Sequence, residues 1–237
     1  MSYLEVRGLR VGYGSLPVLQ GIDFDVEAGQ TTVLLGLNGA GKTTTVASIA
    51  GLLKPSGGTI TFDGDRIDGR DPPTLVQRGI ALVPEGRRVF PALTLAQNLR
   101  LGSWTTRTRK AELKTAEERV YDYFPILAER RDQFAGTLSG GQQQMLAIGR
   151  GLMCLPKLIL IDEASLGLSP KLAKTVFEIV DRINDDGVTV IIVEQNVGVL
   201  PYADRALIME KGTIVYQGVG DEIRNANLRE RYLGGAA

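Results

Sequence analysis

Histidine is absent from this 237-residue chain, and cysteine occurs only once, at Cys154. Without an imidazole, no histidine can serve as a general base in this chain. A single cysteine excludes an internal disulfide framework and fits a reducing compartment. Because its neighbours in GLMCLPK are mostly apolar, we expect the thiol of Cys154 to pack rather than to react.

Net charge and long hydrophobic runs are also missing. Lys+Arg and Asp+Glu both number 27, so no global field favours nucleic acid or an anionic membrane surface. The apolar runs LILI and VIIV are far shorter than the roughly 20 residues that a membrane helix needs. The N-terminal MSYLEVRGLR has no apolar stretch of the kind found in secretory signals. We expect a soluble protein that reaches a membrane only through a partner.

What the chain does have is the patterning of an α/β fold. Residues 4–35 are strand-like, and Ile22, Phe24 and Val26 alternate with aspartates, as in an antiparallel sheet with one solvated face. Further along, LILID, PKLAKTVFEIVDRIND and VTVIIV alternate between strand-like and helix-like runs. Lys211 and Gly212 predict a hairpin turn between the last two strands.

A change of character from about 94 to 151 predicts a mostly helical insert. Apolar residues recur there at helical spacing, while the other face is charged and is expected to be solvated. The apolar set is Leu113, Ala116, Val120, Phe124 and Leu127. We therefore expect one domain over 1–237, with a core from 1–93 and 152–237 and a helical subdomain at 94–151.

Residues 36–43, GLNGAGKT, match the phosphate-binding pattern G-x-x-x-x-G-K-[ST] without a mismatch, between a predicted strand and a predicted helix. Glycines let backbone N–H groups turn toward phosphate oxygens, and a helix N-terminus adds a positive dipole. Lys42 is expected to reach the β- and γ-phosphates and Thr43 to coordinate Mg²⁺. The expected nucleotide-binding residues here are Asn38, Gly39, Ala40, Gly41, Lys42, Thr43 and Thr44.

Two carboxylates end the buried strand LILID. Asp162 and Glu163 lie at its carboxyl end, which is where ligands bind in open α/β sheets. Because side chains alternate along a strand, the two should point in different directions. We expect Asp162 to hold Mg²⁺ and Glu163 to polarise the attacking water.

A second anion-receptive helix start is predicted at LSGGQ, residues 138–142. Ser139, Gly140, Gly141 and Gln142 precede or open the helical run QQMLAIGRGLM. One nucleotide needs one phosphate cradle, so the chain either binds two nucleotides or faces a nucleotide held by another copy. The spacing alone does not decide between these.

The three motifs, in this order, resemble the ATP-binding subunits of ABC transporters over essentially the whole chain. That resemblance implies a P-loop NTPase core of mixed sheet with an antiparallel β subdomain and a helical insert. It also implies a head-to-tail dimer, in which Ser139, Gly140 and Gly141 of one subunit contact ATP held by the other. Tyr13, in VGYG, matches the aromatic residue that stacks on adenine in this family.

Two further stretches narrow the resemblance. VPEGRRVFPALTLAQNL (83–99) and IIVEQN (191–196) are similar to ATPase subunits of branched-chain amino-acid uptake systems. Glu85 stands where most ABC ATPases have glutamine, in the loop implied to meet Mg²⁺ and water. Gln195 stands where most have histidine, and it can contact the γ-phosphate by hydrogen bonding but cannot titrate. These departures shift the catalytic weight to Glu163.

Other departures weaken the contacts expected across a dimer. Ala164 replaces the usual proline, and Ser169 replaces the usual aspartate, in the loop after Glu163. Beyond Glu85, the resemblance places Arg87, Arg88 and Phe90 near the groove that receives a short helix of the membrane subunit. An aromatic beside two cations is typical of an interface anchor.

The sequence thus predicts an ATPase, using ATP and Mg²⁺, that powers import of a small solute, with branched-chain amino acids as the first candidate. Its implied partners are transmembrane permease subunits, a second ATPase subunit in a homo- or heterodimer and, indirectly, a solute-binding protein, with no nucleic acid. Its implied location is the cytoplasmic face of the inner membrane. Urea or amide import, a non-transport ABC protein and a metabolic P-loop kinase remain the alternatives.

Overall fold

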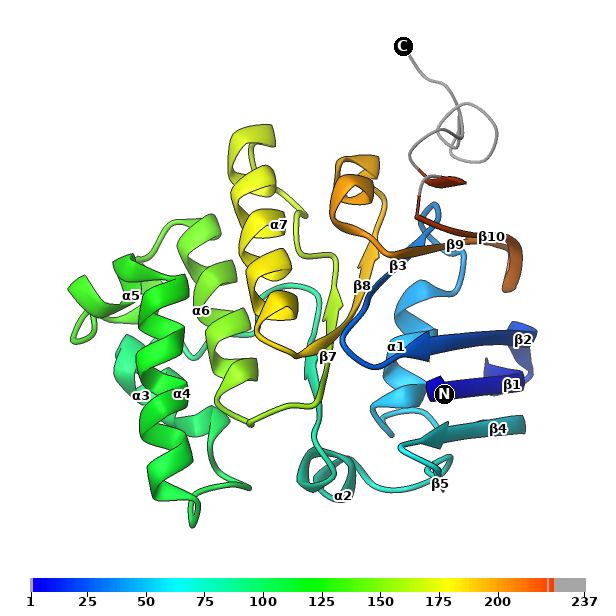
Figure 1. The fold of residues 1–237 in the computed structure, drawn as a ribbon, viewed down its shortest axis with the longest axis horizontal. Coiled ribbons are helices and arrows are strands. Elements are labelled where there is room, and N and C mark those ends of the chain that lie inside the picture. The colour runs from blue at the N-terminus through cyan, green and yellow to red at the C-terminus, as the bar shows by residue number, and fades with distance from the viewer. Residues whose placement is uncertain (1, 221, 224–237) are drawn as a thin grey trace.

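A mixed six-stranded sheet forms the centre of the molecule, in the computed structural model that describes residues 2–220 and 222–223 (Figure 1). Its strands, in spatial order, are β10 (Thr213–Val219), β9 (Arg205–Glu210), β3 (Thr31–Leu35), β8 (Thr189–Glu194), β7 (Leu158–Asp162) and β6 (Ile80–Val83). The last five are parallel, and β10 pairs antiparallel with β9. The β9–β10 connection at Lys211 and Gly212 confirms the predicted hairpin.

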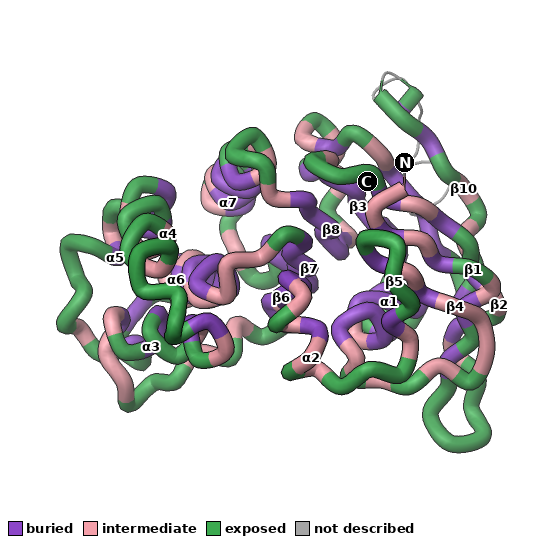
Figure 2. Tube along the Cα trace, turned by 60° about the horizontal axis from the view of Figure 1, so that its bottom comes forward, coloured by how far each residue is buried: buried purple, intermediate pink, exposed green. Residues whose placement is uncertain are grey.

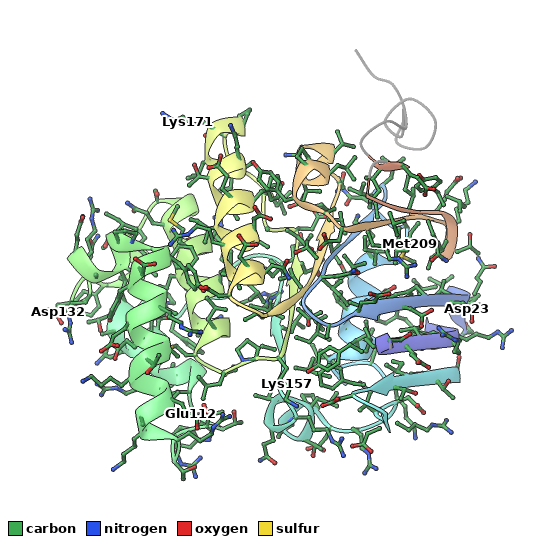
Figure 3. The ribbon with its side chains drawn as sticks, viewed as in Figure 1. Asp23, Glu112, Asp132, Lys157, Lys171 and Met209 are labelled. Atoms are coloured by element: carbon green, nitrogen blue, oxygen red, sulfur yellow. The ribbon has the colours of Figure 1, made fainter. Side chains whose placement is uncertain are left out.

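A second, antiparallel sheet contains the N-terminal strands. In spatial order it comprises β2 (Leu16–Glu27), β1 (Ser2–Tyr13), β4 (Gly57–Phe62) and β5 (Asp65–Arg66). Ile22, Phe24 and Val26 are buried, whereas Asp23 between them is exposed (Figure 3). The predicted one-sided sheet is therefore confirmed.

Helices cover both faces of the central sheet. On one face, α1 (Lys42–Ile49) lies between the two sheets, and its Val46 and Ile49 pack in one core with Leu160 and Ile191. On the other face, the amphipathic α7 (Pro170–Asp185) packs against the remaining residues of the same strands. Burial in Figure 2 is accordingly concentrated along β7, β8 and these helices. The short α2 (Pro72–Gln77) precedes β6.

The remaining helices gather at one end of the molecule (Figure 1). They are α3 (Leu95–Gly102), α4 (Lys110–Tyr123), α5 (Pro125–Glu129) and α6 (Gly140–Leu152). The apolar pattern of 113–127 spans two helices, because Pro125 opens α5 and the residue before a proline avoids helical backbone. Glu112 and Asp132 mark the exposed surface of this group (Figure 3). The division into subdomains stays a prediction.

Short 3₁₀ segments complete the chain, at η1 (Ala135–Thr137) and η2 (Val197–Tyr202). None of the helices within 2–220 and 222–223 combines the length and apolar character needed to cross a bilayer. Cys154 is partly buried, with Sγ 3.2 Å from the carbonyl oxygen of Gly102. It packs against the main hydrophobic core, as expected, and burial raises the pKa of the thiol to about 11.

The sheet order brings four strand ends together. β3, β8, β7 and β6 are consecutive parallel neighbours, so their carboxyl ends lie along one edge. Residues 36–43 follow β3, residues 195–196 follow β8, Glu163 follows β7 and Glu85 lies two residues beyond β6. The fold therefore places the motifs of distant sequence segments at one edge, as expected of ligand sites in such sheets.

Candidate functional site

The loop between β3 and α1 forms a tight turn that depends on glycine. Gly41 has φ 106° and precedes α1, and a Cβ there would come within 2.8 Å of Leu19 Cδ2 and 3.2 Å of Met209 Cε. No other residue type fits this backbone without strain. Because Gly41 carries no side chain to cap α1, the protein leaves the helix start available to an anion.

Lys42 is nearly buried at this turn, with 5% of its surface exposed. Its Nζ donates to the carbonyl oxygens of Gly36 at 2.9 Å and Leu37 at 3.3 Å, and it lies 3.3 Å from Glu163 Oε1. The ammonium group is thereby held over the loop, where a phosphate would compete for the same donors.

Thr43 and Asp162 are brought together from α1 and β7. The Thr43 hydroxyl donates to Asp162 Oδ1 at 3.2 Å. Burial, together with the negative charges of Glu163 and Glu85, raises the pKa of Asp162 to about 6, although the Thr43 hydrogen bond opposes this. Glu85 is exposed and reaches this pair through charge alone.

Glu163 turns away from Asp162, but not for the reason that strand alternation suggests. β7 ends at Asp162, and Glu163 adopts a left-handed backbone with φ 55°. Its carboxylate approaches Lys42 at 3.3 Å and accepts from Gln195 Nε2 at 3.3 Å. The two carboxylates therefore have separate partners, one beside Thr43 and one beside Lys42.

The polar end of IIVEQN divides into three different roles. Gln195 alone faces the loop after β3, where its Nε2 donates to Asn38 Oδ1 at 2.5 Å. Glu194 is buried and accepts from the backbone N–H and the hydroxyl of Ser165. Asn196 caps η2 by accepting from Gly198 N at 2.9 Å. Only one of the three side chains thus contacts the candidate phosphate site.

The β9–β10 turn supports the loop in a way that the motif pattern does not reveal. Gly212 N donates to Ala40 O at 2.9 Å, and Gly212 O accepts from Gln20 N at 2.9 Å. A Cβ at Gly212 would lie only 1.8 Å from Val18 O, so glycine is required there. In the sequence, Gly212 indicates only a hairpin turn. Its hydrogen bonds to Ala40 and Gln20 could not be predicted, because they depend on the fold.

The start of α6 is separate from this cluster. Ser139 Oγ accepts from Gln142 N, and Gln142 Oε1 accepts from Ser139 N at 3.0 Å, which forms a capping box. Arg87 lies over this helix start, because a Cβ on Gly140 would be 2.9 Å from Arg87 Nη2. Among the described residues, no hydrogen bond or ion pair joins this helix start to Lys42 or Asp162.

The other predicted residues lie farther from the cluster. Tyr13 ends β1 and is 53% exposed, at a turn whose partner residue is Leu16. Phe90 is 49% exposed, and the Arg150 guanidinium lies 5.4 Å from the centre of its ring. Both aromatic rings are therefore available to other molecules.

The cluster joins an ammonium, a hydroxyl, two carboxylates and an amide around one glycine-rich turn. Such a set can bind phosphate, hold a hard cation between oxygens and polarise a water. Within residues 2–220 and 222–223, no group of three or more Asp, Glu, Cys or His side chains is arranged to hold a metal. A cation here would need further oxygens from a bound phosphate, as is usual for Mg²⁺.

Comparisons with known proteins point to one family. The ABC transporter family matches residues 19–166. BraG of Pseudomonas aeruginosa, a high-affinity branched-chain amino acid transport ATP-binding protein, is 43% identical over 225 residues, covering 94% of this chain and 96% of BraG. The "Probable branched-chain amino acid transport ATP-binding protein LivF" of Archaeoglobus fulgidus is 35% identical over 222 residues, covering 93% of each chain.

Solved structures agree with the sequence relatives. The ADP conformation of an ATP-binding cassette of an ABC transporter superposes with a TM-score of 0.84 at 30% identity. That match covers 95% of this chain and 94% of the other. The resemblance seen in the motifs and the fold class predicted from it are both confirmed. By fold, by motif order and by full-length relatives, the chain belongs to the ABC transporter family as one of its ATP-binding cassettes.

Proposed function

We propose that this chain binds and hydrolyses ATP to power import of branched-chain amino acids across a membrane. The observation that carries the substrate class is the 43% identity to BraG over nearly the full length of both chains. The Lys42–Glu163–Gln195 cluster beside Thr43 and Asp162 supports the ATPase chemistry.

The loop from Gly36 to Thr43 is the proposed phosphate-binding site. Its N–H groups and the α1 dipole attract the phosphates, and Lys42 exchanges its carbonyl contacts for the β- and γ-phosphate oxygens. Loss of the Lys42–Glu163 contact on ATP binding frees the carboxylate for the attacking water. Tyr13 is the proposed stacking partner of adenine.

The Thr43 and Asp162 oxygens fit a magnesium ion. They lie 3.2 Å apart, and burial, followed by the negative charges of Glu163 and Glu85, raises the pKa of Asp162, so a divalent cation would favour its charged form. When bound, Mg²⁺ neutralises charge on the β- and γ-phosphates. Glu85 is placed to contribute through its charge or through a water.

Hydrolysis itself is assigned to Glu163 and Gln195. Glu163 accepts a hydrogen bond from the attacking water and orients it toward the γ-phosphate. Gln195 donates its amide hydrogens, which now contact Asn38 and Glu163, to the γ-phosphate oxygens. No histidine exists to perform either task.

Ser139, Gly140, Gly141 and Gln142 are proposed to contact the ATP held by a second ATPase subunit. Their helix start is apart from Lys42 within one chain, so a partner copy or a related subunit must supply the facing nucleotide. Transmembrane permease subunits are the proposed partners at a groove beside Phe90. Residues that line this groove include Val76, Leu82, Phe90, Leu101, Trp104 and Arg150. With such partners, the proposed location of the chain is the cytoplasmic face of the membrane.

Uptake of labelled solutes in cells that lack this chain tests the proposal. The panel comprises leucine, isoleucine, valine, a polar amino acid and urea, with rescue by wild-type or Lys42→Ala protein. We expect branched-chain uptake alone to fall, and only the wild type to restore it. Loss of urea uptake with intact leucine uptake would contradict branched-chain amino acids as the substrate and would leave the proposed ATPase function unchanged.

A further inference from the structure

We propose that Glu194 is a positioning residue for ATP hydrolysis, which holds the backbone of Glu163 through Ser165. The inference rests on the proposed function of Glu163 and adds a residue that the motifs do not include. Its basis is the set of contacts between the end of β8 and the loop that follows β7.

Glu194 is the last residue of β8 and is 1% exposed. Its Oε1 accepts from Ser165 N at 2.8 Å, and its Oε2 accepts from Ser165 Oγ at 2.9 Å and from Asn196 N at 3.4 Å. A buried carboxylate is costly unless such donors surround it, and burial raises the pKa of Glu194 despite them. An apolar residue would fill the same place without this cost, so the buried polar side chain indicates a requirement for the Ser165 contact.

The segment that this contact holds is strained. Glu163 has φ 55°, and a left-handed backbone at a residue other than glycine is unfavourable and persists only where the surroundings enforce it. β8 enforces it on both sides. At the strained residue itself, Glu163 N donates to Val193 O at 2.9 Å. Two residues further along, Ser165 is held by Glu194.

The same strand end also carries the side chain that faces Glu163. Gln195 follows Glu194 directly and donates to Glu163 Oε1 at 3.3 Å and to Asn38 Oδ1 at 2.5 Å. Release of Ser165 would therefore let the Glu163 carboxylate move relative to Gln195 and the loop after β3. A displacement of about 1 Å at such a group can reduce a rate by about a hundredfold.

Two substitutions at Glu194 separate positioning from charge. Glu194→Gln keeps an oxygen for Ser165 N and offers an amide hydrogen to Ser165 Oγ, which can accept as well as donate. Glu194→Val removes both contacts and leaves Ser165 N–H unpaired in a buried place. Ser165→Ala removes only the hydroxyl contact and keeps the backbone one.

The measurements are kcat and KM for ATP hydrolysis and the Kd for ATP, on the purified full-length chain with Mg²⁺. We expect Glu194→Val to lower kcat by about 10- to 100-fold while KM and Kd stay within about twofold. Glu194→Gln should stay within about threefold of the wild-type kcat, because the glutamine restores both contacts. The kcat of Ser165→Ala should lie between those of Glu194→Val and Glu194→Gln.

A Glu194→Val chain that keeps its thermal melting point and hydrolyses ATP at the wild-type rate would overturn the inference. Equal losses in Glu194→Gln and Glu194→Val would also overturn it, because charge rather than positioning would then matter. Should Glu194→Val fail to fold, Ser165→Ala with a wild-type kcat would be the contradicting result. A wild-type chain that does not hydrolyse ATP overturns the proposed function as well, whereas an active wild type beside an equally active Glu194→Val overturns this inference alone.

Discussion

The glycine-rich starts of α1 and α6 resemble each other in sequence but differ in how the protein treats their free N–H groups. At α1, the residue before the helix is Gly41, which offers no capping side chain. At α6, Ser139 and Gln142 cap each other, and the Arg87 guanidinium lies over Gly140. One helix start is left open to a ligand, and the other is closed by its own residues.

The surroundings reinforce this difference. Lys42, Thr43 and Asp162 converge at α1, so the site has a cation, a hydroxyl and a carboxylate from one chain. Among the described residues, no carboxylate or lysine side chain makes a hydrogen bond or ion pair with the α6 start, and a phosphate there must compete with the Ser139 cap. A site that is complete at α1 and incomplete at α6 is what a shared dimer interface requires.

The largest expected effect separates phosphate binding from hydrolysis. Glu163→Gln should lower kcat by about 10²- to 10⁴-fold, since the amide cannot act as a base. ATP affinity should be kept, because the change leaves Lys42 and the loop after β3 free to contact the phosphates, so both helix starts stay engaged in a nucleotide-bound dimer. Steady-state phosphate release and size-exclusion chromatography with ATP measure the two properties. Hydrolysis near the wild-type rate would remove Glu163 from its assigned role.

Next in size is a change that disables the α1 start alone. Lys42→Ala should weaken ATP binding by about 10- to 100-fold, because a charged hydrogen-bond donor to phosphate is lost. Isothermal titration with ATP and Mg²⁺ gives the Kd. Lys211→Ala is the matched control, since that side chain is 87% exposed on the nearby hairpin turn. Equal affinity in the two variants would contradict the phosphate role of Lys42.

The smallest effect concerns the cap of α6. Ser139→Ala should lower the unfolding free energy by about 1 kcal/mol, as is usual for loss of an N-cap. Thr94→Ala removes an equivalent capping box from α3 and should cost a similar amount in urea unfolding. ATP hydrolysis should fall only for Ser139→Ala. A parallel fall in Thr94→Ala would show that stability, rather than phosphate contact, explains the loss.

The sheets and the phosphate-binding turn could largely be predicted from the sequence, because local residue patterns specify them. The alternation around Phe24 predicts the antiparallel sheet, and Gly41, Lys42 and Thr43 predict an anion-binding turn between strand and helix. The parallel order β3–β8–β7–β6 then brings the strand ends together. Helical periodicity was misleading at Phe124, where the proline that follows it starts a new helix.

The features that sequence reasoning missed depend on long-range pairing. Glu194 directly precedes Gln195 in IIVEQN, yet its partner is Ser165, which lies 29 positions away in the chain. The left-handed backbone of Glu163 and the support of Ala40 by Gly212 likewise arise from neighbouring strands. No local pattern encodes such contacts, because they exist only once the sheet order is set.

Mixing two inactive variants tests the central claim most directly. Lys42→Ala disables the α1 start, and Ser139→Phe blocks the α6 start, so each protein alone should be inactive. In mixed dimers one site has an intact α1 start from one subunit and an intact α6 start from the other. We predict that a one-to-one mixture recovers about a quarter of the wild-type ATPase rate, since half of the randomly paired dimers carry one intact site. A mixture that stays as inactive as its components would contradict a site shared between two copies of this chain.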